Sequence, residues 1–333
     1  MLLKRFAIDL GTNNIVIYVP KKGIVVNEPN IVALNSSGEI EAIGSRAKEM
    51  LGRTPENMEA NAPLVDGVIA DFKTTQNVLK YYINNIAGSF RLVRPEIMVS
   101  IPTGITSTEK RAVHDALISA GAKKVYIIKS PVAAAIGANV PISEPAGNLV
   151  VSLGGGTTEI AIISLGGIVA QSSIRVGGVK IDRSIADYTR KNYGLIIGSQ
   201  TAEEIKKEIG TALPMDKPQK KQVSGRDLVT GMPRMIDLHS NEIAHAISDR
   251  LEEIMLAIKN VLEQTPPELS SDIIDRGIVL TGGLAYLKNL DKLMAKITGV
   301  PITIAADPNL CVVRGAALAL ENLDEYLKSI ISK

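Results

Sequence analysis

Two stretches of the chain repeat one pattern, in which an apolar strand, a turn of small residues and a second apolar strand follow one another. The first reads FAIDLGTNNIVIYV (6–19) and the second reads VVSLGGGTTEIAII (150–163), with Asp9 opposite Ser152. Glycine turns lack Cβ atoms, so their backbone N–H groups can approach phosphate oxygens closely. Two such turns in register, roughly 140 residues apart, favour phosphate binding over two unrelated hairpins. We therefore predict a duplicated fold whose two loops clamp a polyphosphate from both sides.

The composition limits the classes of function. The 333 residues are enough for two domains with their own cores. A net charge of +2 without a long basic run argues against nucleic acid as the main partner. One cysteine and three scattered histidines exclude disulfides and Cys/His metal sites. The apolar start is too short for a signal peptide and no 18-residue apolar run exists, so we expect a cytoplasmic protein.

Strand-like runs such as EIMVSI and KVYII alternate with helical segments such as 107–120 and 241–263. In the second helical segment, apolar residues recur every three or four positions and form one face: Ile243, Ile247, Leu251, Ile254, Ile258 and Val261. This alternation predicts an α/β fold with a largely parallel sheet. The chain has neither G-x-x-x-x-G-K-[ST] nor G-x-G-x-x-G after a strand, which leaves P-loop and Rossmann folds without support.

The motifs along the chain resemble those of the MreB family of actin-like ATPases almost end to end. They include IDLGTNNI, GIVVNEPNIVAL, GRTPEN, DGVIADF, PVAAAIGA, GGGTTEIAIISLGGIV, TAEEIKKEIG, GRDLVTGMPR and TPPELSSDIIDRGIVLTGG. The resemblance implies a duplicated actin-like (ribonuclease-H-like) α/β fold of two domains, with ATP or ADP and Mg²⁺ in the cleft between them. It places domain I at 1–143 plus 315–333, with a small subdomain at about 33–73. Domain II would span 144–314, with a small subdomain at about 183–248.

The resemblance also assigns the residues around the phosphates. Asp9 is expected to orient the hydration shell of Mg²⁺, for which a carboxylate oxygen is a suitable partner. The two phosphate loops would comprise Gly11, Thr12 and Asn13, and Gly154, Gly155, Gly156 and Thr157. The resemblance further implies that Thr157 positions the attacking water.

A further set of residues is expected near the nucleoside by the same resemblance: Gly177, Gly178, Lys180, Glu203, Glu204, Lys207, Gly282, Gly283 and Leu284. Without the resemblance, the segment from Glu203 to Lys207 would be interpreted as a solvated helix with ion pairs at i, i+3 and i+4 spacing. Leu284 stands where the family has a third glycine, so we expect its branched side chain to crowd the base.

Two positions depart from the family pattern where hydrolysis would take place. The family has a glutamate before the proline of a motif like E-E-P-x-A-A-A-I-G-A, but this chain reads KSPVAAAIGA, with Lys129 and Ser130 at the acidic positions. The second phosphate loop of the family opens with aspartate, which is Ser152 here. A hydroxyl cannot act as a base near neutral pH, and losing such a group typically costs about 10²–10⁴ in rate. We therefore predict nucleotide binding with weak or absent hydrolysis, and we expect Lys129 to point to the face opposite Ser130.

The resemblance implies that the chain associates with itself into filaments. Other MreB paralogues, the inner membrane surface and the cell-shape machinery are the further partners that it implies. A membrane contact is expected in GSFRLVRP (88–95), where Phe90, Leu92 and Val93 are interleaved with arginines. The alternative is a loop whose apolar residues pack inward. On the membrane interpretation, the protein is cytoplasmic and peripheral at the inner face of the cell membrane.

Three functions remain open from the sequence. The first is the filament protein with impaired hydrolysis, and the second is a fully active ATPase whose hydrolysis drives filament turnover. The third, a small-molecule kinase of the same superfamily, is disfavoured because such kinases are usually longer and need an acidic base. A chaperone of the heat-shock type would need a substrate domain, for which the chain is too short.

Overall fold

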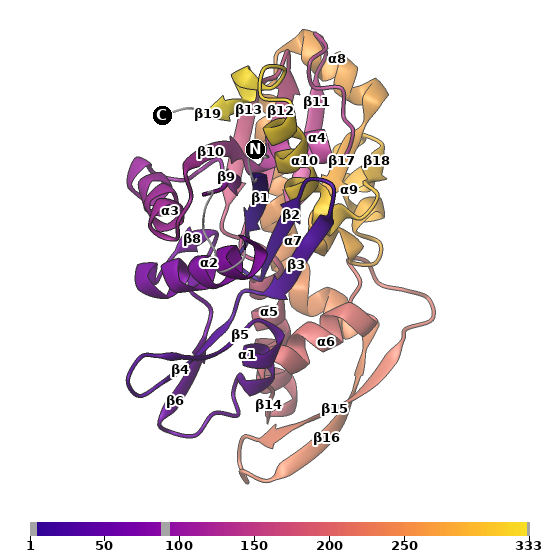
Figure 1. Cartoon of the computed structure of the whole chain (residues 1–333). Helices are drawn as coiled ribbons and strands as arrows, with labels where there is room; N and C mark the ends of the chain where they lie inside the picture. Colours follow the sequence, from indigo (N-terminus) through magenta and orange to yellow (C-terminus); the bar gives the residue numbers. More distant parts are fainter. Residues whose placement is uncertain (1–4, 88–93, 332–333) are drawn as a thin grey trace.

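Two central sheets organise the computed structural model, which describes residues 5–87 and 94–331 (Figure 1). The first sheet has the strand order β19-β10-β9-β1-β2-β3, and the second has the order β13-β12-β11-β17-β18. The strands of the first sheet are β1 (Arg5–Leu10), β2 (Asn14–Val19), β3 (Gly23–Pro29), β9 (Glu96–Ile101), β10 (Lys124–Lys129) and β19 (Ile330–Ile331). Those of the second sheet are β11 (Asn148–Leu153), β12 (Thr158–Ser164), β13 (Gly167–Ile174), β17 (Ile278–Thr281) and β18 (Ile302–Ile304).

The two sheets share the topology of five strands, and the first sheet adds β19 antiparallel to β10. β1, β2 and β3 form an antiparallel meander, and β9 and β10 extend the sheet in parallel from β1. In the second sheet, β11, β12 and β13 form the meander, and β17 and β18 extend it in parallel from β11. The predicted duplication is therefore confirmed. The prediction of a largely parallel sheet is wrong, because the short loops of the repeat join neighbouring strands as hairpins, which are antiparallel.

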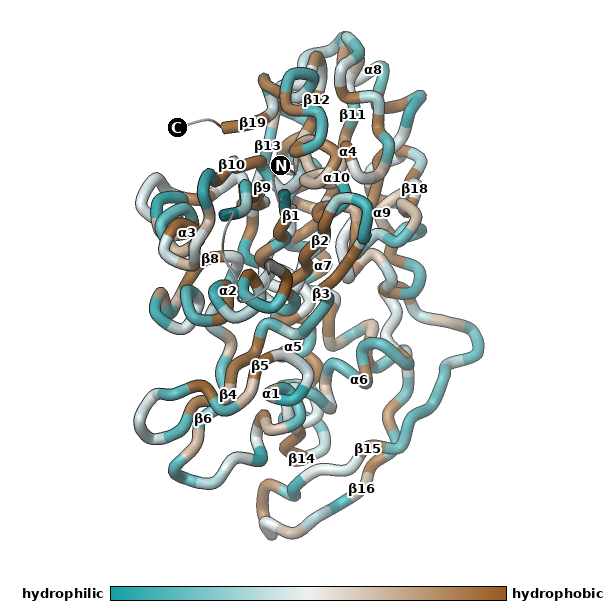
Figure 2. The backbone as a smooth tube through the Cα atoms, in the orientation of Figure 1, coloured by the Kyte–Doolittle hydropathy of each residue, from teal (hydrophilic) through white to brown (hydrophobic). Residues whose placement is uncertain are grey.

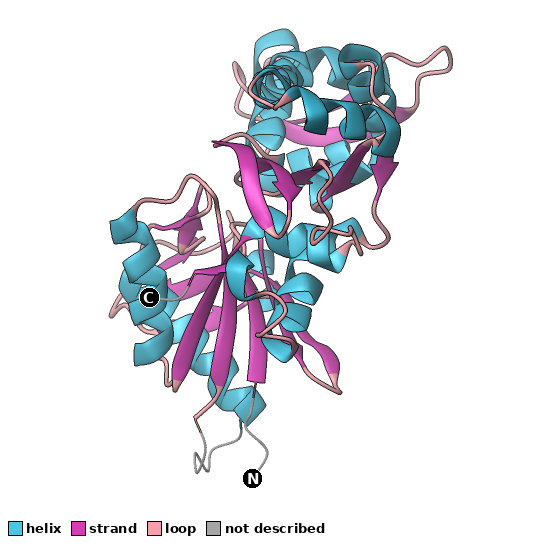
Figure 3. Cartoon of the chain, turned by 90° about the horizontal axis from the view of Figure 1, so that it is seen from above, coloured by secondary structure: helices cyan, strands magenta, loops and turns pink. Residues whose placement is uncertain are grey.

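Helices flank the strands in both halves (Figure 3). They are α2 (Phe72–Ala87), α3 (Ser107–Ser119), α4 (Ser130–Gly137), α5 (Gly178–Tyr193), α6 (Ser199–Ile209), α7 (Ser240–Glu263), α8 (Pro267–Arg276), α9 (Leu290–Thr298) and α10 (Cys311–Glu321). The six apolar positions predicted for α7 are each at most 2 % exposed, which confirms its buried face. Figure 2 shows hydrophobic residues along central strands such as β1 and β2. In the two described ranges, no helix combines the length and the apolar composition that crossing a membrane requires.

Two small sheets lie beyond the central ones, at the end drawn at the bottom of Figure 1. One consists of β4 (Val32–Asn35), β5 (Ile40–Ile43) and β6 (Met58–Asn61), beside α1 (Ser45–Met50). The other consists of β14 (Leu195–Ile196), β15 (Lys220–Asp227) and β16 (Pro233–His239), beside α5 and α6. The remaining short elements are β7 (Leu64–Val65), β8 (Val68–Ile69) and the 3₁₀ helices η1 (Gly283–Tyr286), η2 (Pro308–Leu310) and η3 (Leu327–Ser329).

Helices α4 and α10 cross in backbone contact. An added Cβ at Gly137 would lie 1.9 Å from the carbonyl oxygen of Cys311, and one at Gly315 would lie 1.8 Å from that of Ala133. Only glycine permits so close an approach. Side chains from β1, β9, β11 and β12 pack with these two helices in one hydrophobic cluster. The two halves of the molecule therefore share a core, which fixes the cleft between them.

Candidate functional site

The two repeated loops and the strand ends beside them line a cleft between the halves of the molecule. The cleft has a volume of about 420 Å³. Most of the predicted site residues line it: Asp9, Gly11, Thr12, Asn13, Ser130, Ser152, Gly154, Gly155, Gly156, Thr157, Gly178, Glu203, Lys207, Gly282, Gly283 and Leu284. Segments that are far apart in the sequence therefore meet at one site.

The two loops are built on the same turn. In the first loop the backbone N–H of Gly11 donates to the carbonyl of Asn14 over 3.0 Å, and in the second that of Gly154 donates to Thr157 over 2.9 Å. The side chain of Asn30 donates from Nδ2 to the carbonyl of Gly11 over 2.8 Å. This hydrogen bond therefore stabilises the position of the first loop.

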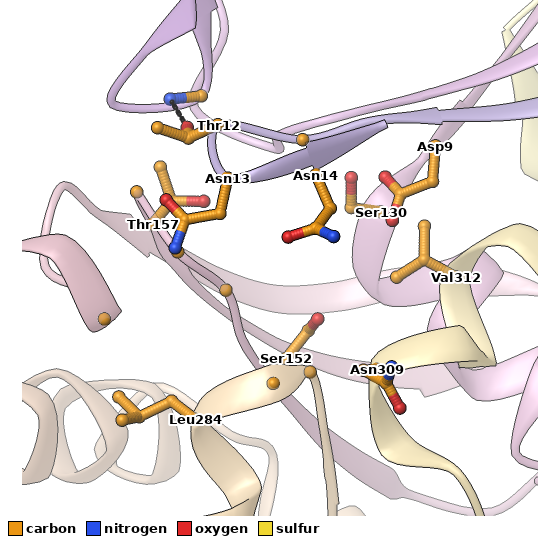
Figure 4. Close-up of a pocket in the computed structure, with 18 of the residues that line it drawn as sticks. Asp9, Thr12, Asn13, Asn14, Ser130, Ser152, Thr157, Leu284, Asn309 and Val312 are labelled. Carbon is orange, nitrogen blue, oxygen red and sulfur yellow. Dashed lines mark hydrogen bonds between the residues drawn. The ribbon is translucent and has the colours of Figure 1, made fainter. Parts of the chain in front are cut away.

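The loops touch one another across the cleft. An added Cβ at Gly155 would lie 2.5 Å from Asn13 Cγ, and one at Gly156 would lie 2.3 Å from Thr12 Oγ1. Thr12 Oγ1 also accepts a hydrogen bond of 2.9 Å from the backbone N–H of Gly67 (Figure 4). The second and third glycines of the GGG turn are therefore needed for the contact between the halves, in addition to any role toward a ligand.

Asp9 brings a carboxylate to the end of β1. Ser100 Oγ donates to Asp9 Oδ1 over 2.9 Å. Burial raises the pKa of Asp9 to about 6, and the hydrogen bond from Ser100 opposes this shift. A nearby cation would stabilise the ionised form, so the carboxylate suits a Mg²⁺ ion that keeps several waters. Residues 5–87 and 94–331 contain no cluster of three His, Cys, Asp or Glu side chains that would hold a metal alone, so phosphate oxygens and water would have to supply the other ligands.

Ser130 and Ser152 bring hydroxyls to the cleft. Ser130 is the first residue of α4, and Ser152 lies near the end of β11. Figure 4 shows the Ser152 hydroxyl pointing toward the wall that carries Asp9 and Ser130. Lys129 is directed elsewhere, because its Nζ donates to Gln171 Oε1 on β13 over 3.1 Å. This contact between the halves agrees with the expectation that Lys129 and Ser130 point to different faces.

Sequence reasoning missed Glu159, a buried carboxylate on β12 that lines the same cleft. Glu159 is 3 % exposed and lies directly across the strand pair from Ser152. Thr103 donates to Glu159 Oε2 from its backbone N over 2.8 Å and from Oγ1 over 2.7 Å, and Ser173 Oγ donates to Oε1 over 2.6 Å. Thr103 follows β9 and Ser173 lies on β13, so Glu159 links the two halves. The available signal was a charged residue inside the apolar strand TEIAII.

Glu203 on α6 lies between two lysines. Its Oε2 is 2.6 Å from Lys48 Nζ on α1, and its Oε1 is 2.8 Å from Lys207 Nζ. Burial raises the pKa of Glu203, but the hydrogen bonds from Lys207 and Lys48 outweigh burial and lower the pKa to about 2. The predicted i, i+4 pair with Lys207 is present. The pair with Lys48 joins positions 155 residues apart, so no local sequence pattern could predict it.

Lys206 is a second site residue that the sequence did not reveal. Its Nζ lies 2.7 Å from Asp182 Oδ1 and donates to the carbonyl of Gly178 over 3.2 Å. The side chains of Lys206 and Asp182 are only 11 % and 10 % exposed, whereas Lys207 is 63 % exposed. Burial raises the pKa of Asp182 to about 6 in spite of the lysine beside it. Lys206, on α6, therefore places a buried ammonium group in the cleft wall, beside the first turn of α5.

Three predicted residues lie outside the cleft lining. Gly177 packs behind the second loop, where an added Cβ would lie 2.6 Å from the carbonyl oxygen of Gly155. Lys180 lines a neighbouring cavity of about 640 Å³, which Lys48 also lines. Glu204, on α6, is exposed.

Leu284 lines the cleft, but its side chain is 5 % exposed and packs in the hydrophobic core of the second half. The expectation that its branched side chain crowds the base stays a prediction. The predicted membrane residues Phe90, Leu92 and Val93 lie outside the described residues.

Known proteins match this chain over nearly its whole length. The sequence pattern of the family described as MreB/Mbl protein matches residues 3–328. The cell shape-determining protein MreB of Escherichia coli (strain K12) is 48 % identical, over 100 % of this chain and 98 % of the relative. The cell shape-determining protein Mbl of Bacillus subtilis (strain 168) is 46 % identical, over 100 % of both chains.

Solved structures give the same result. MreB5 of Spiroplasma citri bound to ADP is 35 % identical, with a TM-score of 0.93 and coverage of 98 % of both chains. The same protein bound to AMPPNP also has a TM-score of 0.93. Together with the duplicated sheets and the facing glycine loops, these matches show that the fold is actin-like and that the chain belongs to the MreB/Mbl family.

Proposed function

We propose that this chain binds ATP or ADP with Mg²⁺ in the cleft. The observation that carries the proposal is the contact between the two loops, which brings the backbones of both halves to one cleft. Backbone N–H groups of such loops, with the buried ammonium of Lys206 nearby, suit a polyphosphate chain. MreB5 of Spiroplasma citri, which shares this fold, was solved with ADP and with AMPPNP.

Each wall of the cleft has a separate role in this proposal. The loops Gly11–Asn13 and Gly154–Thr157 hold the phosphates, and Asp9 orients the waters of the metal ion. Mg²⁺, when bound, neutralises charge on the phosphate oxygens. Thr157 positions the attacking water, while Glu203 and Lys207 form the wall beside the nucleoside.

We further propose that hydrolysis is weak or absent. Ser130 and Ser152 replace carboxylates expected around the metal and the water, and a hydroxyl does not take a proton from water near neutral pH. Glu159 is the observation that favours the alternative, a fully active ATPase. Its oxygens already accept three hydrogen bonds from Thr103 and Ser173, but an ionised carboxylate has about four acceptor positions. A water could therefore still be oriented by it.

The biological role that we propose is a filament that organises cell shape at the inner face of the cell membrane. Two relatives with 48 % and 46 % identity are named cell shape-determining proteins. Contact with the membrane would come from Phe90, Leu92 and Val93, and other MreB paralogues and the cell-shape machinery would be partners.

We also propose the domain division expected from the resemblance. The chain would pass from domain I (1–143 plus 315–333) to domain II (144–314) after α4 and return within α10. The backbone contact of these two helices would then lie at the junction of the domains.

Sedimentation paired with phosphate release tests this function. Both are measured with and without ATP, for the native protein and for the double variant Ser130→Glu plus Ser152→Asp. We expect the native protein to pellet with ATP and release little phosphate, and the double variant to release phosphate about 10²-fold faster or more. Rapid phosphate release by the native protein, equal to that of the double variant, would contradict impaired hydrolysis and support the active ATPase. A native protein that binds no nucleotide would overturn the proposal as a whole.

A further inference from the structure

One buried carboxylate joins three segments of the chain beside the phosphate loops. Glu159 is the second residue of β12 and is 3 % exposed. Its Oε2 accepts hydrogen bonds from the backbone N–H and the hydroxyl of Thr103, and its Oε1 accepts one from the hydroxyl of Ser173. All three donors are neutral, and an ionised carboxylate binds such donors more strongly than a neutral acceptor does. Glu159 therefore fixes the loop after β9, which belongs to the first half, against β12 and β13 of the second half.

The loop that Glu159 holds also packs beside the phosphate loops. Pro102, the neighbour of Thr103, lines the cleft. Gly67 is close both to this proline and to Thr157, because an added Cβ at Gly67 would lie 3.1 Å from Pro102 Cγ and 3.0 Å from Thr157 Cγ2. Groups packed this closely cannot move independently. A shift of the loop after β9 would therefore change the surroundings of Thr157.

The direction of β12 places Thr157 and Glu159 on the same side of the chain. The hydroxyl of Thr158, between them, donates to the carbonyl of Val176 over 2.7 Å, and Val176 belongs to the core of the second half. Neighbouring side chains along a strand point to opposite faces. Thr157 and Glu159 therefore share the other face, in agreement with the cleft that both residues line. Fixing Glu159 against the first half thus also fixes the position of Thr157 relative to that half.

We propose that Glu159 is a positioning residue through which the cleft distinguishes a nucleoside triphosphate from a diphosphate. In the proposed function Thr157 lies beside the terminal phosphate, because it positions the water that attacks this group. Glu159 holds the loop after β9, and that loop contributes to the packing around Thr157. Contacts made to the terminal phosphate therefore depend on Glu159 more than contacts made to the inner phosphates. This inference rests on the proposed binding of a nucleotide and adds which side chain makes the site sensitive to the terminal phosphate.

Affinities for AMPPNP and for ADP separate this role from a merely structural one, which would weaken both ligands by the same factor. Both dissociation constants are measured by calorimetry at the same free Mg²⁺ concentration, for the native protein, Glu159→Ala and Glu159→Gln. Glu159→Ala removes all three hydrogen bonds, and it should weaken AMPPNP binding about tenfold or more and ADP binding less than about threefold. Glu159→Gln should stay within about threefold of the native protein for both ligands, because its amide can still accept from Thr103 and donate to Ser173.

Two further variants complete the experiment. Thr103→Val removes one hydroxyl donor and keeps the backbone N–H, at a residue that is not among the described residues lining the cleft. It should weaken AMPPNP binding about three- to fivefold and leave ADP binding within about twofold, and it decides the question if Glu159→Ala does not fold. Glu242→Ala is the matched control. Glu242 also accepts hydrogen bonds from two hydroxyls and a backbone N–H, but it is not among the described residues of the cleft lining, so both affinities should stay unchanged.

Three results would overturn the inference while the native protein still binds both ligands and the proposed function stands. The first is an equal loss of AMPPNP and ADP binding in Glu159→Ala and Thr103→Val, because Glu159 would then only support the fold. The second is unchanged affinity for both ligands in these variants. The third is a Glu159→Gln variant that loses AMPPNP binding as Glu159→Ala does, because the charge would then act on the ligand or its metal directly. A native protein that binds neither ligand refutes the proposed function and this inference with it.

Discussion

The carboxylates of the cleft differ in whether a charged side chain lies beside them. Glu203 has two lysines, and its pKa falls to about 2 because their hydrogen bonds outweigh burial. Asp9 has only the hydroxyl of Ser100 as its hydrogen-bond partner in the described part of the chain, and burial raises its pKa to about 6. Asp9 would therefore gain from a cation supplied with a ligand, whereas Glu203 already has two lysines.

The pH dependence of stability tests this reading of Asp9. Its folded pKa of about 6 lies above the usual 3.8, so its stabilising contribution is present below about pH 4 and is lost as pH rises through 6. Asp9→Asn should therefore be more stable than the nucleotide-free native protein at pH 7.5, by about 1–3 kcal/mol, with a smaller difference at pH 4. Urea denaturation of both proteins between pH 4 and 8 measures this. A difference that does not change with pH would contradict the prediction, and Mg²⁺ with ATP should stabilise the native protein more than the variant.

Helices and strands followed the sequence where local chemistry decides them. The apolar period of α7 and the glycine turns of the two hairpins were predictable, because each is set by residues a few positions apart. The crossing of α4 and α10 was not, because Gly137 and Gly315 each face a carbonyl of the other helix and look like ordinary small residues in their own segments. Lys206 was missed for the same reason, since its partner Asp182 lies on another helix.

The helix crossing makes a prediction about stability. In Gly315→Ala the new Cβ would lie 1.8 Å from the Ala133 carbonyl oxygen, so α4 and α10 must move apart. We expect a loss of about 3 kcal/mol or more in the free energy of unfolding, measured by urea denaturation. Gly198→Ala is the control, because an added Cβ there meets nothing within 4 Å and it should cost less than about 1 kcal/mol. Equal stabilities of the two variants would show that the crossing tolerates a side chain.

Across the whole molecule, polar contacts join the two halves at several places around the cleft. Glu159 connects the loop after β9 to β13, and Lys129 connects β10 to β13. At the lower end of Figure 1, Lys48 on α1 pairs with Glu203 on α6 and its carbonyl accepts a hydrogen bond from Gln200. Because Glu203 also lines the cleft, this last contact joins the small sheets to the proposed nucleotide site.

Removal of this contact should loosen the lower end without unfolding the protein. In Lys48→Met, amide hydrogen exchange within α1 should become about two- to fivefold faster, because a partly exposed ion pair contributes about 0.5–1 kcal/mol. Lys220→Met is the matched control, since its pair with Asp237 is exposed and lies within one hairpin. If hydrogen exchange in α1 is the same in the native protein and in Lys48→Met, the ion pair does not stabilise α1 against α6.

The sequence by itself determined the duplicated strand–loop–strand units, the glycine loops, the helix faces and the two serines at expected acidic positions, because these follow from short-range patterns and from side-chain chemistry. Only the tertiary structure decided which loops touch and that Glu159 and Lys206 line the cleft. These features depend on the approach of segments that are distant in the chain. The packing of the two halves, and not any local sequence pattern, brings these residues together.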